Sequence, residues 1–239
     1  MQIKTTQYIF PPRPKTCIPK SNTSIMQTLN WEAQYKYNGV RILIKYLPSP
    51  TGQVKDTPIQ LWNRHGDRLW SYTIHEDLHQ QLLNLSEHLQ ISTLETSILD
   101  GELIDSKHKA LKDTIAIWDI LVKNSKHLIG TTYKERYDMI TPTNNNYTFK
   151  APHGNFTIGK KYSKDILRPE NYNHKHWNNM WDLVDNINKP YKTKNGTLAP
   201  LIEGLVFKNP HGTLEPGWNN NNNSDWQCRS RVKTNISQF

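Results

Sequence analysis

The sequence has only two cysteines, Cys17 and Cys228, among 239 residues. Two cysteines cannot build a disulfide framework or a zinc site. No apolar run approaches the roughly 20 residues that a membrane-spanning helix needs. The first fifteen residues contain no apolar stretch of the kind found in secretory signals. These absences predict a protein that avoids membranes and works in a reducing cytoplasm.

Basic residues are in excess, with 30 Lys+Arg against 21 Asp+Glu and a formal net charge of +9. Nucleic acid is the commonest partner of such chains, because Lys and Arg release counterions from phosphates. Genome composition or a need for solubility explains an excess of basic residues about as well. The net charge alone is therefore only weak support for a nucleic-acid partner. The length fits one large domain with its own core. We expect a proline-rich arm over residues 1–30 and a single catalytic domain over residues 31–239.

Short β-branched or alternating apolar runs predict strands. They cover Val40–Tyr46, Ile98–Ile104, Ile115–Val122 and Leu201–Lys208. Apolar residues at helical spacing predict helices at residues 74–89, 133–140 and 177–187, and these stripes are expected to face the core. Thr73 with Glu76, and Thr132 with Glu135, have the spacing of capping boxes. Strands and helices do not alternate, which favours an α+β fold with antiparallel sheets flanked by helices over a doubly wound sheet.

Four segments place charged residues beside glycine or along a strand. Lys36 lies three residues before Gly39, where a glycine permits close backbone approach to a ligand. Asp100 and Glu102 flank a glycine within an apolar run, and Glu203 precedes another glycine. Burying such carboxylates costs free energy unless a cation or metal meets them. The fourth segment places Arg229, Arg231 and Lys233 on one strand face. Each segment alone also fits an ordinary turn or a solvated surface.

Together, their order and spacing resemble the nucleotidyltransferase motifs of ATP-dependent polynucleotide ligases and mRNA capping enzymes. The matching segments are Lys36–Arg41, Asn63–Gly66, Asp100–Glu102, Ile117–Asp119, Glu203–Lys208 and Arg229–Lys233. The resemblance spans about residues 31–233 and implies the adenylation fold. The Leu-Asp-Gly-Glu-Leu and Glu-Gly-Leu-Val-Phe-Lys segments are most similar to DNA ligases. The Pro-Pro-Arg-Pro arm and the Trp-Asn-Arg-His-Gly segment are similar to small ligases of phages and other viruses.

The resemblance implies three steps at phosphorus. Lys36 attacks the α-phosphate of ATP, AMP then passes to a 5′-phosphate, and a 3′-OH finally displaces AMP. Because an ammonium cannot attack, the family's chemistry requires a lowered pKa at this lysine, which nearby cations and a bound metal would provide.

The resemblance also assigns roles around the nucleophile. Glu203 would organise Mg²⁺, with Mn²⁺ as an alternative, and Glu102 would hold the ribose or share the metal. Trp118 would stack on adenine, although core packing explains a tryptophan there equally well. Gln34, with the backbone of Tyr35, would read the adenine N6 amine. The cations that would contact phosphate are Arg41, Arg64, Lys208, Arg229 and Arg231; which two of Arg229, Arg231 and Lys233 do so is open.

Three departures from the family pattern are visible. Asn38 stands where Asp is commoner, and Arg229 and Arg231 stand where lysines are usual, so a general-acid role there is disfavoured. Six residues follow Lys233, which predicts a catalytic core without an OB domain. We therefore expect a monomeric ATP-dependent DNA ligase that binds nicked duplex through its own basic surface, weakly and with strong salt dependence. An RNA or mixed RNA/DNA ligase acting on RNA-containing duplex is the alternative; a guanylyltransferase or a non-catalytic nucleic-acid-binding module is less favoured.

Overall fold

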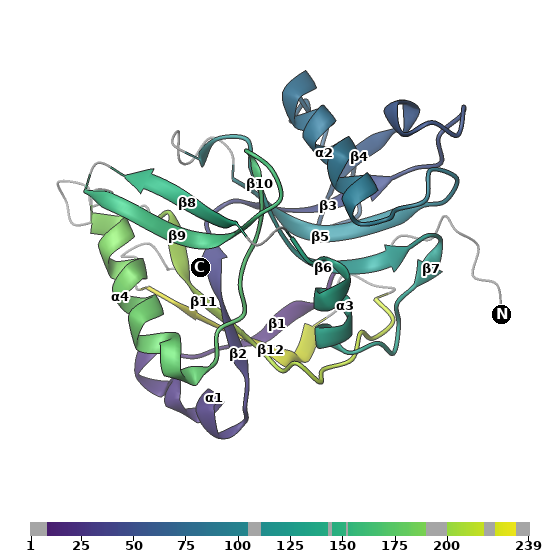
Figure 1. Ribbon diagram of the computed structural model, residues 1–239. Helices are drawn as coiled ribbons and strands as arrows, with labels where there is room; N and C mark the ends of the chain where they lie inside the picture. Colours follow the sequence, from purple (N-terminus) through teal and green to yellow (C-terminus); the bar gives the residue numbers. More distant parts are fainter. Residues whose placement is uncertain are drawn as a thin grey trace.

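Two β-sheets organise the protein (Figure 1). The computed structural model describes residues 9–104, 111–142, 145–151, 153–189, 200–217 and 223–232. The small sheet has the order β1-β12-β11-β2, with β1 (Arg13–Cys17), β2 (Glu32–Tyr37), β11 (Ile202–Lys208) and β12 (Asn223–Arg231). The large sheet has the order β4-β3-β5-β6-β10-β9-β8, with β7 paired to β6. Its strands are β3 (Val40–Tyr46), β4 (Ile59–Asn63), β5 (Ser97–Ile104), β6 (Thr114–Lys123), β7 (Lys126–His127), β8 (Asn146–Ala151), β9 (Gly154–Lys161) and β10 (Ile166–Arg168).

Four α-helices accompany the sheets in the described part of the chain, namely α1 (Ser24–Thr28), α2 (Glu76–His88), α3 (Tyr133–Met139) and α4 (Trp177–Asn188). The architecture is consistent with the expected α+β class, although it is rich in sheet. The expectation of antiparallel sheets is wrong for two pairs, because β1 runs parallel to β12 and β10 runs parallel to β6. Both pairs join segments separated by long connections, which parallel pairing requires. Among the described residues, no helix has the length and apolar character needed to cross a bilayer.

The predicted strands agree with β3, β5, β6 and β11 to within one residue at each end. The capping box of Thr132 and Glu135 is confirmed at the start of α3. The box predicted from Thr73 and Glu76 is wrong, because α2 begins at Glu76 itself. His75 is its N-cap and accepts a hydrogen bond from the Leu78 backbone N–H at 3.2 Å. The helix therefore begins after the position that Thr73 would cap.

Two hydrophobic cores hold these elements together. In the first, Ile42 and Ile44 of β3 belong to the same buried cluster as Leu78 and Leu82 of α2. In the second, the buried face of α4 packs on the small sheet, and Trp177 meets Phe207 edge-on with ring centroids 4.8 Å apart. The apolar stripe predicted over residues 177–187 is this buried face. The second cluster also contains Ala116 and Leu167 of the large sheet. Residues from both sheets line the cavity described next.

Candidate active site

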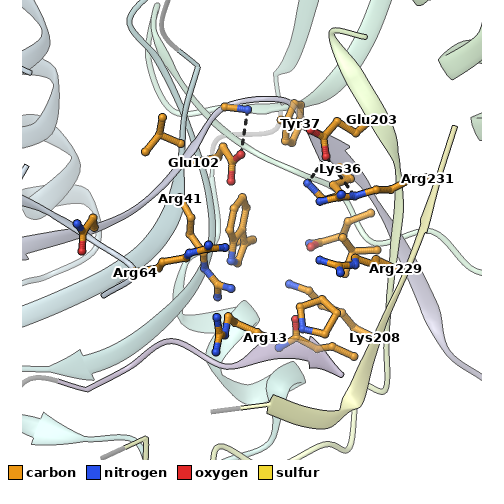
Figure 2. A pocket seen from close by; sticks show the side chains of 18 of the residues that line it. Arg13, Lys36, Tyr37, Arg41, Arg64, Glu102, Glu203, Lys208, Arg229 and Arg231 are labelled. Atoms are coloured by element: carbon orange, nitrogen blue, oxygen red, sulfur yellow. Dashed lines mark hydrogen bonds and ion pairs between the residues drawn. The ribbon is translucent and has the colours of Figure 1, made fainter. Parts of the chain in front are cut away.

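A cavity of about 500 Å³ lies between the two sheets. One wall comes from β2, β11 and β12, and the other from β3, β5 and β6, with β1 and the turn after β4 completing it (Figure 2). Every predicted site residue except Tyr35 lines it. These residues are Gln34, Lys36, Arg41, Arg64, Glu102, Trp118, Glu203, Lys208, Arg229 and Arg231. Residues far apart in the sequence thus share one cavity, while Lys233 lies outside the described residues.

Strand register explains the arrangement on the small sheet. Directly paired residues of neighbouring strands present their side chains on the same face. Lys36, Gly204 and Arg231 form one row across β2, β11 and β12. Gln34, Val206 and Arg229 form the next row, about 7 Å along the strands. Residues two positions apart in one of these strands therefore lie next to each other along the cavity wall.

Lys36 is held at one end of this wall by an ion pair. Its Nζ lies 2.5 Å from Glu203 Oε2, and the same oxygen lies 3.5 Å from Arg231 Nε. Both Lys36 and Glu203 keep about a fifth of their side-chain surface exposed, at 19% and 22%. Solvent, or a ligand in the cavity, can therefore reach the amine without any rearrangement of the backbone.

Glu203 reaches the cavity because of a local irregularity in β11. Its neighbour Gly204 already faces the cavity, so regular alternation would turn Glu203 away. The register with β2 shifts between Ile202 and Gly204, and Gly204 has φ +142°. A Cβ at Gly204 would overlap the carbonyl oxygen of Ser230. Only glycine fits this backbone, which explains the Glu-Gly pair at this strand entrance.

Asp100 organises the opposite wall. It accepts two hydrogen bonds from Arg41, from Nε at 2.9 Å and from Nη2 at 2.5 Å, and a third from the Trp118 indole N–H at 3.0 Å. Asp100 pairs with Asp119 and Gly101 with Ile117, so Trp118 is the extra residue of a β-bulge. Bulges re-aim side chains. Asp100 thus fixes both a guanidinium and an indole at the cavity surface.

Glu102 lies beside this group and faces the Lys36 end of the cavity (Figure 2). Its Oε1 accepts the Gly39 backbone N–H at 2.9 Å. Burial raises the pKa of Glu102, and the charges of Lys36 and Arg41 oppose that rise. The nearby Glu203 carboxylate raises the pKa further. The two glutamates therefore influence one another across the cavity.

Gln34 and Tyr35 point to opposite sides of β2. Gln34 is buried, and its Nε2 donates to the Tyr133 hydroxyl at 2.9 Å and to the Pro169 carbonyl at 3.4 Å. A carbonyl only accepts, so this contact fixes the amide orientation and leaves Oε1 as an acceptor. Tyr35 packs in the second core against Tyr172. Its side chain is absent from the cavity, and only its backbone is available for the predicted role.

Lys208 occupies the end of the wall away from Lys36. It lies four positions after Gly204 in β11, a distance of about 13 Å along the strand. Its Nζ lies over the rings of Tyr133 at 4.3 Å and Trp118 at 5.9 Å. Burial lowers its pKa to about 7. Lys208 is therefore a buried amine beside aromatic rings, and its predicted contact with the α-phosphate stays a prediction.

Sequence reasoning missed two contributions to the site. Asp119 forms a buried ion pair with Arg136 of α3, with distances of 2.8 and 3.1 Å. The pair anchors the helix that carries Tyr133, the partner of Gln34. Arg13 of β1 also lines the cavity, although no individual role was predicted for it from the sequence. The prolines on either side of Arg13 favour extended backbone, which could have indicated a strand. No local pattern indicated that this strand pairs with β12.

No group of three or more His, Cys, Asp or Glu side chains suited to a metal occurs among the described residues. A fully protein-made metal cage is therefore missing from that part of the chain. Glu102 and Glu203 remain as carboxylates facing the cavity. This set fits Mg²⁺, which commonly takes one or two carboxylates and completes its shell with water and substrate phosphates.

The solved structures that resemble this chain in fold include ligases. No protein-family model and no curated protein matches the sequence. The ligase domain of LigD from M. tuberculosis aligns with 92% of this chain and 59% of its own, at TM-score 0.51 and 14% identity. A mycobacterial DNA ligase D complexed with ATP and MES aligns with 96% of this chain and 61% of its own, at TM-score 0.51 and 14% identity. Pmar-Lig_PreS3 aligns with 94% of this chain and 47% of its own, at TM-score 0.54 and 13% identity.

At these identities the likeness establishes the fold alone. The chain has the fold of the nucleotidyltransferase domains of ATP-dependent DNA ligases. It spans less than two thirds of each of those chains. The expected resemblance is confirmed at the level of fold, and the chemistry has to be argued from the site.

Proposed function

We propose that the protein is an ATP-dependent polynucleotide ligase that works through a covalent lysyl-AMP intermediate on Lys36. One observation carries the proposal. In a ligase-domain fold, the Lys36 amine lies 2.5 Å from Glu203 at the end of a cavity that also holds an indole and several arginines. Such a cavity suits a nucleotide, with an aromatic surface for the base and cations for the phosphates.

The first step forms a bond from Lys36 Nζ to the α-phosphorus and breaks the bond from that phosphorus to the bridging oxygen, so that pyrophosphate leaves. Nζ must lose a proton before it can attack. Glu203 Oε2 is the nearest base at 2.5 Å and would accept that proton. Arg231, in the same row as Lys36, would contact the non-bridging oxygens and stabilise their charge.

The nucleoside would lie along the wall from Lys36 towards Lys208. Trp118 offers its indole to the adenine from one side, and Val206 lines the cavity from the other sheet. Gln34 Oε1 would accept a hydrogen bond from the adenine N6 amine. Guanine carries a carbonyl oxygen in the corresponding place, so an acceptor there favours ATP over GTP.

Glu203 and Glu102 are the residues that would hold Mg²⁺ when it accompanies the nucleotide. A bound ion would neutralise charge on the phosphoryl oxygens. Mn²⁺ takes similar oxygen ligands and is the alternative.

The later steps transfer AMP to a 5′-phosphate and then join that end to a 3′-OH. We propose nicked duplex DNA as the substrate, because the chain folds like DNA ligase domains. An RNA or mixed RNA/DNA ligase uses the same cavity, and a series of nicked duplexes with DNA or RNA on either side of the break decides between them.

The test of the first step is labelling of the protein by ATP carrying ³²P at the α-position. We expect a label that survives alkali and is released by acid, as a P–N bond requires. Lys36→Ala should reduce it to background, while Lys15→Ala, at a surface ion pair with Asp225, should match the wild type. Label from GTP alone would indicate capping chemistry. Equal labelling of wild type and Lys36→Ala would refute the proposal.

A further inference from the structure

A glutamine that reads a purine base has to be oriented, because the two ends of its amide are alike in shape. The oxygen accepts a hydrogen bond and the nitrogen donates one, and a half-turn of the amide exchanges them. With its oxygen towards the ligand, Gln34 matches the N6 amine of adenine. With its nitrogen there, it would match the carbonyl oxygen at C6 of guanine or hypoxanthine. The orientation of this one amide therefore sets which base the cavity prefers.

The surroundings of Gln34 take up both hydrogens of its amide nitrogen. Nε2 donates to the Tyr133 hydroxyl at 2.9 Å and to the Pro169 carbonyl at 3.4 Å. Gln34 is only 3% exposed, so these partners rather than bulk water set the orientation of the amide. The Pro169 carbonyl only accepts and would repel Oε1 if the amide were turned. At 3.4 Å this contact is long, so the Tyr133 hydroxyl supplies the stronger bond.

A tyrosine hydroxyl both accepts and donates, so the role of Tyr133 depends on where its single proton lies. The hydroxyl donates to Asn171 Oδ1 at 3.3 Å and is thereby left as an acceptor for Gln34. A turned Gln34 would place Oε1 against this hydroxyl, which would then have to give up its bond to Asn171. Tyr133 is 0% exposed, so bulk solvent does not replace the lost bond.

Asn171 is oriented in turn by a carboxylate. Burial raises the pKa of Glu32, while the charge of Lys134 and a side-chain hydrogen bond with Asn171 lower it. An ionised carboxylate only accepts, so the Asn171 amide nitrogen is the donor and its Oδ1 is left for the Tyr133 hydroxyl. The donors therefore all point one way along this series, from the Gln34 amide towards the Glu32 carboxylate.

Packing holds the ring of Tyr133 independently of its hydroxyl. Tyr133 is the first residue of α3, and its ring stacks on Trp226 of β12 with centroids 5.6 Å apart. The Lys208 amine lies 4.3 Å from the centroid of the same ring. Phenylalanine at this position keeps both ring contacts and removes only the hydroxyl. The orienting role can therefore be tested apart from the packing of the ring.

We propose that Tyr133, held by Asn171, keeps Gln34 oriented as an acceptor and so makes the cavity select adenine over a 6-oxopurine. The inference rests on the proposed function and deepens it, because it names the residues that set the nucleobase specificity of the same cavity. Tyr133 and Asn171 lie outside the six segments that resemble nucleotidyltransferase motifs. Tyr133 acts through Gln34 and is therefore a positioning residue.

Adduct formation with three triphosphates, followed by intact-protein mass spectrometry, tests the proposal. The adduct is the nucleoside monophosphate joined to Lys36, with pyrophosphate released. ATP carries an amine at C6 and ITP a carbonyl oxygen, so the wild type should form the AMP adduct faster than the IMP adduct at equal, low concentrations. Tyr133→Phe should reduce the ratio of these two rates roughly 10-fold. The rate with purine riboside triphosphate, which has only hydrogen at C6, measures any loss common to all nucleotides.

Tyr137→Phe is the matched control. Tyr137 is buried on the same helix, and its hydroxyl donates to the Pro169 carbonyl at 2.7 Å. The same chemical change there should leave the ratio of AMP to IMP adduct rates as in the wild type. Asn171→Ala, at a half-buried position, removes the acceptor of the Tyr133 proton. It should lower the ratio even if Tyr133→Phe does not fold.

The outcomes separate this inference from the proposed function. An unchanged ratio in folded Tyr133→Phe protein, or in Asn171→Ala where Tyr133→Phe does not fold, would refute the inference. An equal fall in Tyr137→Phe would refute it as well, because the effect would then come from the packing of α3. Equal rates with ATP and ITP in the wild type would show that Gln34 is not held as an acceptor. Absence of any adduct on the wild type would instead refute the proposed function.

Discussion

Replacing Arg136 by methionine should strongly destabilise the fold, because it leaves a buried carboxylate without its counterion. Arg136 is 0% exposed and Asp119 is 2% exposed. The guanidinium makes two hydrogen bonds to Asp119 and a third, at 2.6 Å, to the Thr131 carbonyl. Methionine roughly fills the aliphatic part of the side chain but satisfies none of these acceptors.

The size of the effect follows from the burial of the pair. Breaking a buried ion pair by removing one partner costs about 3–5 kcal/mol, against about 0–1 kcal/mol for an exposed pair. For a domain of this size, each kcal/mol corresponds to roughly 2–4 °C in Tm. Arg136→Met should therefore lower Tm by roughly 6–20 °C. Asp119→Leu should have a comparable effect, since it leaves the guanidinium buried and unpaired.

Urea unfolding followed by tryptophan fluorescence measures the loss, and the double variant Asp119→Leu with Arg136→Met tests its cause. Removing both charges should cost clearly less than the sum of the single variants. Lys134→Ala, which breaks the exposed pair with Asp138 on the same helix, is the matched control. A loss below 1 kcal/mol for Arg136→Met, or strict additivity in the double variant, would refute the reasoning.

Three further variants test other parts of the cavity. Burial lowers the pKa of Lys208 from 10.5 to about 7. Between these pH values the unfolded chain binds a proton at Lys208 that the folded chain lacks, so the stability of the fold rises with pH. Lys208→Met removes this penalty, so its gain in urea midpoint should be largest at pH 7 and fade towards pH 10; a gain that does not change with pH would contradict the lowered pKa. Gly204→Ala should destabilise the fold by roughly 1–3 kcal/mol or more, because the added Cβ would overlap the Ser230 carbonyl oxygen. A urea midpoint equal to that of the wild type would argue against the backbone conformation described for Gly204. Asp100→Asn should raise the ATP concentration for half-maximal labelling about 10-fold, since Arg41 and Trp118 lose their shared acceptor; unchanged ATP dependence would exclude this positioning role.

Local patterns in the sequence predict much of the site because most of its residues are spaced for a strand. Gln34 and Lys36 differ by two positions, as do Arg229 and Arg231, and a strand puts each such pair on one face. The same alternation places Tyr35 on the opposite face, in the core. The strand runs themselves were identifiable from apolar and β-branched residues.

Contacts between residues far apart in the sequence could not be predicted from local sequence patterns. Nothing near Arg136 indicates that it pairs with Asp119 rather than with solvent, because the contact depends on how α3 packs on β6. The parallel pairing of β1 with β12 joins residues about 210 positions apart in the sequence. The cap of α2 was misassigned for a different reason, because general preferences favour Thr over His at an N-cap, and His75 nevertheless supplies the acceptor.

The residues that a regular strand would misplace are the ones nearest the proposed chemistry. Gly204 lies directly between Lys36 and Arg231, so its missing side chain leaves room beside the amine. Its φ of +142° and the adjoining register shift turn Glu203 to the same side. In β6, a bulge makes Trp118 an additional residue opposite Asp100. Both irregularities depart from strict two-residue alternation. A strand pattern can therefore identify the cations of this cavity. The positions of the Glu203 carboxylate and the Trp118 indole depend instead on Gly204 and on the bulge in β6.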